Sequence, residues 1–210
     1  MKLNKTIVII GGSAGSDICS EILSVQYKRI LFLETYSQRI SENRIIGKKI
    51  KDGISFLSKK NVDYFIATGD NDQRKENFEY IYKKTGKTPI NCIHPSAYIS
   101  LSAKIGNGNL ICPHAVIHTE AVIGNNTIIN TSSVVEHDCV IDDYAQISPN
   151  TTLCGRDEIG EGAFIGAGSV IVPKIKIGKK SVIAAGSSVI TNVPANTLYA
   201  GVPAVFKKKI

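Results

Sequence analysis

The residue of this chain best placed for proton transfer is His137, which stands between two carboxylates, Glu136 and Asp138. A carboxylate that orients an imidazole ring and stabilises its protonated form makes the histidine an effective general base. The order Glu-His-Asp does not by itself say which carboxylate does this. A surface histidine without a role is the alternative interpretation.

Three other histidines, His94, His114 and His118, precede this one. His114 and His118 have no recognised ligand spacing with His137, so we expect no metal site.

A second group of residues has the character of a phosphate site. Gly11, Gly12, Ser13, Ala14 and Gly15 follow the apolar run 6–10 and open a helical stretch. Backbone N–H groups at such a turn can hold a phosphate. Glu34, which ends the second predicted strand, could accept a hydrogen bond from a ribose or a base, and Gly69, Asp70 and Asn71 follow the third strand at the same edge. The alternative is that all of these are turn residues only.

The elements that must position this second group alternate between strand and helix. Apolar, β-branched runs predict strands, amphipathic stretches predict helices, and their alternation predicts a parallel sheet of βαβ units. The predicted strands cover residues 6–10, 29–34 and 64–68, and the predicted helices 16–26, 52–60 and 71–85. We therefore expect a small α/β, doubly wound nucleotide-binding domain over residues 1–90.

Residues 91–210 follow another rule, because an aliphatic residue occupies every sixth position from Ile93 to Val189. Two residues before each one, the side chain is usually small; the departures are Asn109, Asp157 and Ile175. Neither a helix nor a flat strand has a period of six. A hexapeptide repeat indicates a parallel β-helix, which we expect to have 18-residue coils and no insertion. The tail after Val193 leaves the repeat.

An 18-residue coil places Gly155 directly above His137. A residue without a side chain leaves room there for a thioester or a nucleophile, and its N–H could face an oxyanion. The alternative is a simple corner turn, since Gly106, Gly124, Gly160 and Gly178 recur at one corner and suggest a tight backbone conformation.

The composition excludes several classes of protein. Five cysteines without CxxC spacing indicate reduced thiols in a cytoplasmic protein. No apolar run is long enough to span a membrane. The net charge of +7 is accompanied by no aromatic-interleaved basic stripe, so we expect no nucleic-acid partner.

Two stretches, Asn130–Ile141 (NTSSVVEHDCVI) and Tyr199–Ala204 (YAGVPA), together with the repeat resemble the hexapeptide-repeat acyltransferases. The two-part layout resembles the group of sialic acid O-acetyltransferases and bacterial nucleotide-sugar N-acetyltransferases over essentially the whole chain. The resemblance implies a left-handed parallel β-helix and acetyl-CoA as co-substrate. It also implies a nucleotide-linked amino sugar as substrate and a homotrimer with active sites between subunits.

The resemblance also implies roles for individual residues. His137 corresponds to the general base and Asp138 to its acidic partner. A second histidine found nine residues further on in some sugar N-acetyltransferases is here Gln146, and the glycine loop has Gly15 where the family often has histidine. Residues implied to bind the cofactor are Gln146, Gly155, Ala167, Ala185, Pro203 and Lys208. Residues implied to bind the substrate are Gly12, Ser13, Ala14, Glu34, Gly69, Asp70 and Asn130.

These observations lead us to expect an N-acetyltransferase acting on a nucleotide-linked 4-amino-4,6-dideoxysugar. O-acetylation of a sialic acid or a related sugar is the alternative on the same fold. A non-catalytic trimeric scaffold is the alternative from another class of protein, and it predicts that His137→Asn leaves the function of the protein unchanged. The sequence does not name the sugar or the nucleotide.

Overall fold

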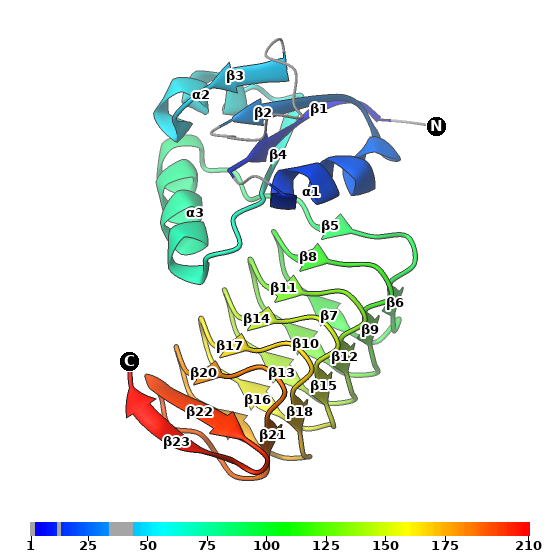
Figure 1. Ribbon diagram of the computed structural model, residues 1–210. Coiled ribbons are helices and arrows are strands. Elements are labelled where there is room, and N and C mark those ends of the chain that lie inside the picture. The colour runs from blue at the N-terminus through cyan, green and yellow to red at the C-terminus, as the bar shows by residue number, and fades with distance from the viewer. Residues whose placement is uncertain (1–2, 12–13, 34–43) are drawn as a thin grey trace. The chain divides into compact units, whose positions relative to one another are not determined.

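The computed structural model describes residues 3–11, 14–33 and 44–210. It divides into two compact units, Met1–Cys92 and Ile93–Ile210 (Figure 1). None of the helices in the described ranges is long and apolar enough to cross a membrane.

The first unit is built on a four-stranded sheet in the order β3-β2-β1-β4, with every neighbouring pair parallel. The strands are β1 (Leu3–Ile10), β2 (Tyr27–Leu33), β3 (Ile45–Gly47) and β4 (Val62–Ile66). The predicted α/β class with βαβ units is confirmed. The short strand β3 was not predicted, because three residues show no alternation to detect.

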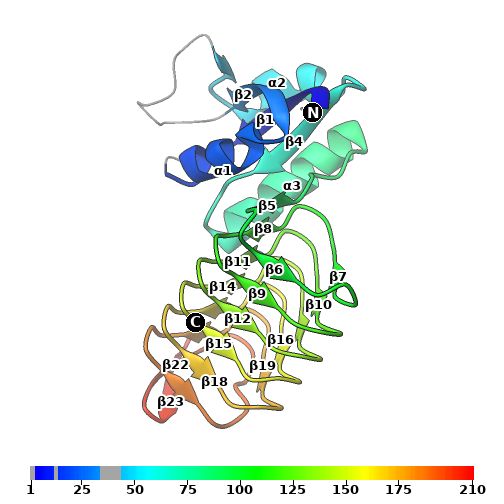
Figure 2. The same ribbon diagram turned by 90° about the vertical axis from the view of Figure 1, so that its right-hand side faces the viewer.

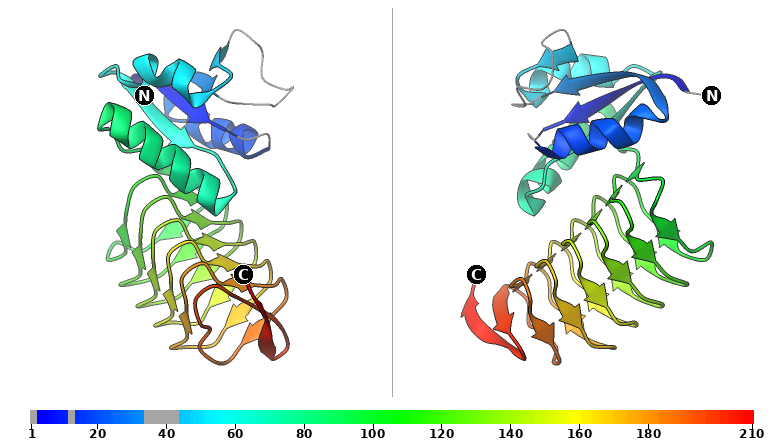
Figure 3. Two further views of the ribbon diagram at one scale, coloured as in Figure 1. Left: turned by 90° about the vertical axis from the view of Figure 1, so that its left-hand side faces the viewer. Right: turned by 45° about the vertical axis from the view of Figure 1, so that its right-hand side comes forward.

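Helices cover both faces of this sheet (Figure 3). They are α1 (Ala14–Ser24), α2 (Ile50–Leu57) and α3 (Asn71–Thr85). Residues of α2 and α3, such as Leu57 and Ile81, pack in one buried cluster with Val8 and Leu31 of the sheet. The predicted limits of α3 are those of the structure: Asp70 caps its first turn and Gly86 ends it at φ +67°. The helix predicted from Ser16 instead begins at Ala14, and the one predicted over 52–60 begins and ends earlier.

The strand order creates a switch point between β1 and β4. From β1 the chain moves through α1 to β2 and β3 on one side, and β4 then pairs with the other side of β1. Ligands of open parallel sheets bind outside the carboxyl ends of strands at such a point. Gly11 and residues 67–70 lie at these two strand ends.

The second unit is a left-handed parallel β-helix made of three sheets of two-residue strands (Figures 1 and 2). Sheet B contains β5 (Cys92–Ile93), β8 (Leu110–Ile111), β11 (Ile128–Ile129), β14 (Gln146–Ile147), β17 (Phe164–Ile165) and β20 (Val182–Ile183). Sheet C contains β6 (Tyr98–Ile99), β9 (Val116–Ile117), β12 (Val134–Val135), β15 (Thr152–Leu153), β18 (Val170–Ile171) and β21 (Ser188–Val189). Sheet D contains β7 (Lys104–Ile105), β10 (Val122–Ile123), β13 (Val140–Ile141), β16 (Glu158–Ile159) and β19 (Lys176–Ile177).

Each coil lies in register with the next at a spacing of 18 residues. Ile123, for example, pairs with Ile105 on one side and Ile141 on the other. The aliphatic residue of every sixth position points into the prism, and from Ile111 onward these side chains are buried. The predicted period therefore directly fixes the register and the core.

The corners between sheets follow one backbone rule. Every sixth residue from Gly108 to Gly186 has a positive φ, and each lies three places after an inward aliphatic residue. The glycines of the recurring corner do not have this conformation, which corrects the expectation drawn from Gly106 and Gly124. A Cβ on Gly106 would lie 2.5 Å from the carbonyl oxygen of Gly124, so these glycines permit close approach between coils.

The tail forms a hairpin that extends sheet B. The strand β22 (Thr197–Gly201) pairs in parallel with β20 at a spacing of 16 residues, and β23 (Ala204–Lys209) pairs antiparallel with β22. The tail leaves the hexapeptide repeat as predicted, but it continues the hydrogen bonding of the sheet.

Candidate active site

His137 and Asp138 occupy the corner that follows β12 of sheet C. The Nδ1 atom of His137 lies 2.8 Å from Oδ2 of Asp138, and both side chains are about half exposed. Asp138 is the corner residue with positive φ, at +61°. This conformation is typical of short polar residues such as Asp and Asn.

The contact fixes the state of both groups. The hydrogen bond from His137 lowers the pKa of the Asp138 carboxyl, burial opposes this, and Arg156 lowers it further. An ionised carboxylate only accepts hydrogen bonds, so Nδ1 carries the proton and Nε2 of a neutral ring keeps its lone pair. The free lone pair of Nε2 is what a general base requires.

Gly155 lies against this Nε2 atom. A Cβ built on Gly155 would be 3.1 Å from Nε2 of His137, and the backbone of Gly155 has φ +110°. Both facts exclude any larger residue without strain. The sequence prediction that Gly155 stacks on His137 is confirmed as a geometric statement; its cofactor role remains a prediction.

Arg156 is a residue of this site that the sequence reasoning missed. Its Nε lies 3.5 Å from Oδ2 of Asp138, and its backbone N–H donates to the carbonyl of His137 at 3.0 Å. The signal was available, because the spacing that places Gly155 above His137 also places Arg156 above Asp138. Arg156 adds a positive charge beside the carboxylate and holds it ionised.

Glu136, the other carboxylate beside His137, has a different partner. Its Oε1 lies 3.8 Å from Nε2 of His118, and the His118 ring lies 6.1 Å from the ring of Tyr98. His118 and Glu136 lie one coil apart, directly after the strands β9 and β12 of sheet C. Of the two carboxylates beside His137, the structure therefore shows Asp138, and not Glu136, in contact with the His137 ring.

The remaining residues predicted to bind cofactor lie along sheet B. Gln146 is in β14, Ala167 and Ala185 are exposed at the corners after β17 and β20, and Lys208 is in β23. Pro203 is exposed in the hairpin between β22 and β23. One chain thus carries the His137 set after sheet C and these residues along sheet B, and it does not bring the two sets together. Asn130, predicted to bind substrate, follows β11 and also lies at the edge of sheet B.

Gly11 and Gly15 of the first unit pack closely on the residues that follow β4. A Cβ on Gly11 would lie 2.6 Å from Oγ1 of Thr68, and one on Gly15 would lie 2.9 Å from the carbonyl oxygen of Ala67. These two glycines therefore bring the two loops of the switch point together. Gly12, Ser13 and Glu34 lie outside the described residues, and Ala14 begins α1.

The loop after β4 is held by Arg74, which the sequence reasoning did not single out. Arg74 is 1 % exposed, and its Nη1 donates to the carbonyls of Thr68 and Gly69 at 3.0 Å. Asp70 accepts from the backbone N–H of Gln73 at 2.8 Å, so one of its oxygens caps α3. The buried arginine escaped notice because arginine in an amphipathic helix normally faces water.

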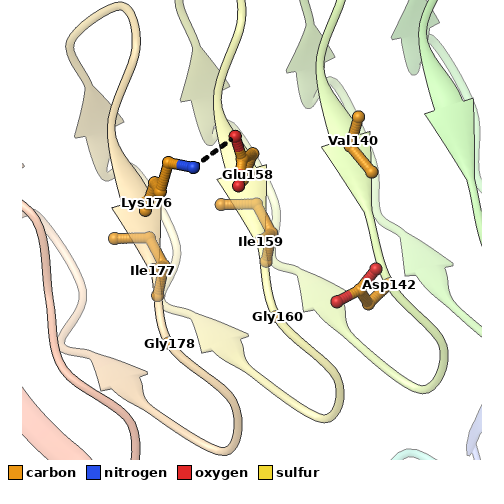
Figure 4. A pocket seen from close by; sticks show the side chains of 8 residues that line it. All are labelled: Val140, Asp142, Glu158, Ile159, Gly160, Lys176, Ile177 and Gly178. Atoms are coloured by element: carbon orange, nitrogen blue, oxygen red, sulfur yellow. Dashed lines mark ion pairs between the residues drawn. The ribbon is translucent and has the colours of Figure 1, made fainter.

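A shallow pocket opens on the outer side of sheet D (Figure 4). Lys176 and Glu158 form an ion pair of 2.8 Å across it, and Asp142 lies at one end. None of the residues predicted for the active site lines it. Among the described residues, no three His, Cys, Asp or Glu side chains gather as a metal site would require.

Two family models match the chain. The bacterial transferase hexapeptide (six repeats) model matches residues 120–155 and 158–191, and the PglD N-terminal domain model matches residues 6–81. A comparison with curated protein sequences gives no match.

Solved structures resemble the chain over its whole length. A histidine-to-asparagine mutant of perosamine N-acetyltransferase from Caulobacter crescentus, in complex with CoA and GDP-perosamine, is 27 % identical with a TM-score of 0.89, covering 100 % of both chains. The acetyltransferase domain of PglB from Neisseria gonorrhoeae, in complex with acetyl coenzyme A, is 29 % identical with a TM-score of 0.90, covering 98 % of this chain and 100 % of that one. The two family models and the solved acetyltransferases thus agree on the same two-part architecture. The chain is a hexapeptide-repeat acyltransferase with a PglD-type N-terminal domain.

Proposed function

We propose that the protein transfers an acetyl group from acetyl-CoA to the amine of a nucleotide-linked 4-amino-4,6-dideoxysugar. The observation that carries this proposal is the free Nε2 of His137, oriented by Asp138 and facing the bare backbone of Gly155. The similar structures that hold CoA with GDP-perosamine, or acetyl coenzyme A, support the choice of both substrates.

In the proposed reaction His137 acts as the general base. The sugar amine attacks the thioester carbonyl, and the C–N bond forms as the carbonyl π electrons move to oxygen. Nε2 takes the proton lost by nitrogen, and Asp138 stabilises the resulting imidazolium. Collapse of the tetrahedral intermediate breaks the C–S bond, and the imidazolium returns a proton to the departing CoA thiolate. A histidine base typically contributes ~10²–10⁴-fold.

The active site is proposed to lie between subunits of a homotrimer. His137 and the residues along sheet B are separated within one chain by sheet C, whose outer side carries the apolar Tyr98, Val134 and Val170. Covering an apolar sheet face with a second copy would bring the edge of one sheet C beside the sheet B edge of its neighbour. Symmetric closed assemblies satisfy this requirement at every subunit.

The first unit is proposed to bind the nucleotide at the switch point between β1 and β4. The glycine loop opens α1 there, and Arg74 holds the facing loop in place. Helix N-termini and adjacent backbone N–H groups favour phosphates. The NAD chemistry of larger doubly wound domains is not part of the proposal.

The decisive test follows thiol release from acetyl-CoA with UDP-, dTDP- and GDP-linked 4-amino sugars. We expect turnover with one nucleotide series, and its loss in His137→Asn. His114→Asn is the matched control, because His114 is an exposed histidine at another corner. Turnover with free sialic acids alone would instead establish O-acetylation. Failure of CoA to bind would overturn the enzyme assignment and favour a scaffold.

A mixing experiment tests the shared site. His137→Asn damages the sheet C edge, and Ala185→Trp obstructs the sheet B edge. If sites form between subunits, each variant alone is inactive, and refolded mixtures regain part of the activity. Mixtures that stay inactive while remaining trimeric would contradict the arrangement.

A further inference from the structure

Asp157 is a carboxylate in the aliphatic core of the β-helix. It is 0 % exposed, and it occupies the inward row that elsewhere holds small residues such as Ala121 and Ala163. Its neighbours on this row, Cys139 and Ile175, lie one coil before and one coil after it, and both are buried. A buried carboxylate is costly unless hydrogen bonds compensate it, so its presence calls for a physical reason.

The hydrogen bonds of Asp157 join two stacked corners of the prism. Its Oδ1 accepts from the backbone N–H of Ile175 at 2.9 Å, whereas its Oδ2 has no hydrogen-bond partner among the described residues. Burial raises the pKa of this carboxyl to about 6, and the backbone N–H groups of Ile175, Cys154 and Gly155 partly offset that rise. The carboxylate therefore faces the peptide groups of the corner 154–157.

The same corner carries the residues that face His137. Gly155 lies against Nε2, Arg156 lies near Asp138, and the carbonyl of Gly155 accepts from the N–H of Lys174 in the corner above. Gly155 lies two places after the inward Leu153 and has φ +110°. At the equivalent place of the earlier corners of the β-helix, no described residue has a positive φ. This corner departs from the regular repeat, and Asp157 is the side chain that ties it to the next coil.

We propose that Asp157 is a positioning residue, which fixes the backbone of the corner 154–157 and thereby holds Gly155 at its distance from the Nε2 of His137. The proposal deepens, and rests on, the acetyltransferase function proposed above. Asp157 does not touch the reacting atoms and acts through the Gly155 backbone. A misplacement of about 1 Å at such a site can cost on the order of 100-fold in rate.

The chain offers a matched control for a test. Asn109 stands on the same inward row, is 0 % exposed, and its Oδ1 accepts from the backbone N–H of Thr127 one coil later at 2.7 Å. It does so at the corner before sheet B, on another edge of the prism. Asp157→Ala and Asn109→Ala both remove an oxygen that accepts from a backbone N–H one coil later, and alanine is already present at buried positions of this row. Asn109→Ala also removes the bond that Oγ1 of Thr127 donates to Asn109 and the bond that Nδ2 of Asn109 donates to the carbonyl of Gly124, so it is the more severe perturbation of stability. Asp157→Asn keeps an oxygen acceptor for Ile175.

Two readouts separate positioning from stability. The first is the ¹⁵N spectrum of the His137 ring, assigned by its loss in His137→Asn; it needs no turnover. The second is kcat and KM for acetyl transfer. We expect Asp157→Ala to shift the His137 ring resonances and lower kcat about 10- to 100-fold, Asp157→Asn to restore both, and Asn109→Ala to lower the Tm while changing neither.

A loss of Tm in both alanine variants, with the His137 resonances and the kinetics unchanged in both, would overturn the proposal. If wild-type protein acetylates no sugar but the His137 resonances still depend on Asp157, the proposed function fails and the positioning role stands. If Asp157→Ala does not fold, Asp157→Asn alone decides. Wild-type kcat and resonances there support the acceptor role, and a loss of kcat in a folded Asp157→Asn protein contradicts it.

Discussion

The buried carboxylate of Asp157 makes the stability of the protein depend on pH in a direction opposite to most acidic residues. Its pKa rises from 3.8 to about 6 in the folded protein, so folding favours the protonated form. Its stabilising contribution is fully present below the unfolded pKa and is lost as pH rises through the folded pKa. Replacement by asparagine removes this titration while preserving shape.

The magnitude follows from the shift. A rise of about two units corresponds to ~3 kcal/mol in all, of which roughly 2 kcal/mol falls between pH 4 and pH 8. We therefore expect the free energy of unfolding of wild type, relative to Asp157→Asn, to fall by about 2 kcal/mol over that range. The quantity to compare is this pH-dependent difference and not the absolute stability of Asp157→Asn, because the side-chain amide of the variant also lacks a hydrogen-bond partner at the position of Oδ2.

Urea unfolding followed by far-ultraviolet circular dichroism, at one protein concentration and at each pH unit from 4 to 8, measures this difference. The other titrating groups are common to both proteins and cancel. Asp142→Asn is the comparison on the same β-helix: partial burial, together with the nearby Asp143, Glu161 and Glu158, also raises the pKa of the exposed Asp142, but by less, so this variant should show a smaller pH-dependent difference. Parallel stability curves for wild type and Asp157→Asn would refute the claim that this carboxyl is buried and titrates near pH 6.

Three further predictions concern the site and the core. His137→Asn should lower kcat by ~10²–10⁴ and leave urea unfolding unchanged, because its side chain is 49 % exposed; an equal loss of stability would show a structural role. Gly155→Ala should lower kcat/KM and also destabilise the fold by ~1 kcal/mol or more, because φ is +110° there and its Cβ would lie 3.1 Å from Nε2; steady-state kinetics and Tm measure these effects, and wild-type kinetics would contradict the close contact. Ile141→Ala should cost ~2–5 kcal/mol in urea unfolding because Ile141 is 1 % exposed, whereas its neighbour Val140, 39 % exposed, should tolerate alanine with a much smaller loss.

The fold of the second unit could be predicted because three of its six-residue repeats make one 18-residue coil, so the spacing of the aliphatic residues gives the register between coils. A residue such as Ile123 must pair with Ile105 and Ile141 once each coil has 18 residues, and the same arithmetic places Gly155 on His137. The meaning of the recurring glycines could not be read in this way. A glycine in the sequence does not tell whether a positive φ or a close approach requires it.

The partner of His137 was undecidable from the residues alone, because both neighbours are carboxylates. The choice depends on the direction in which the corner backbone aims each side chain. Glu136 still lies on the outer side of sheet C and reaches His118, whereas Asp138 stands at the turn with positive φ and reaches Nδ1. Arg74 was missed, and Asp157 was noticed only as a departure from the row of small residues, for a related reason: both are charged side chains whose importance comes from their burial.

The regular corners have a consequence for the portability of the site. The backbone that presents His137 and Asp138 recurs at every sixth residue; Ser132, for instance, has φ +54° against +61° for Asp138. Thr131→His and Ser132→Asp would therefore place the same His-Asp pair at the opposite edge of sheet C, on a backbone that already exists, whereas Pro149, the counterpart of Gly155, does not have the positive φ of Gly155. Moving the His-Asp pair along or around the prism therefore requires only a change of side chains, whereas moving the complete site also requires the irregular backbone of the corner 154–157.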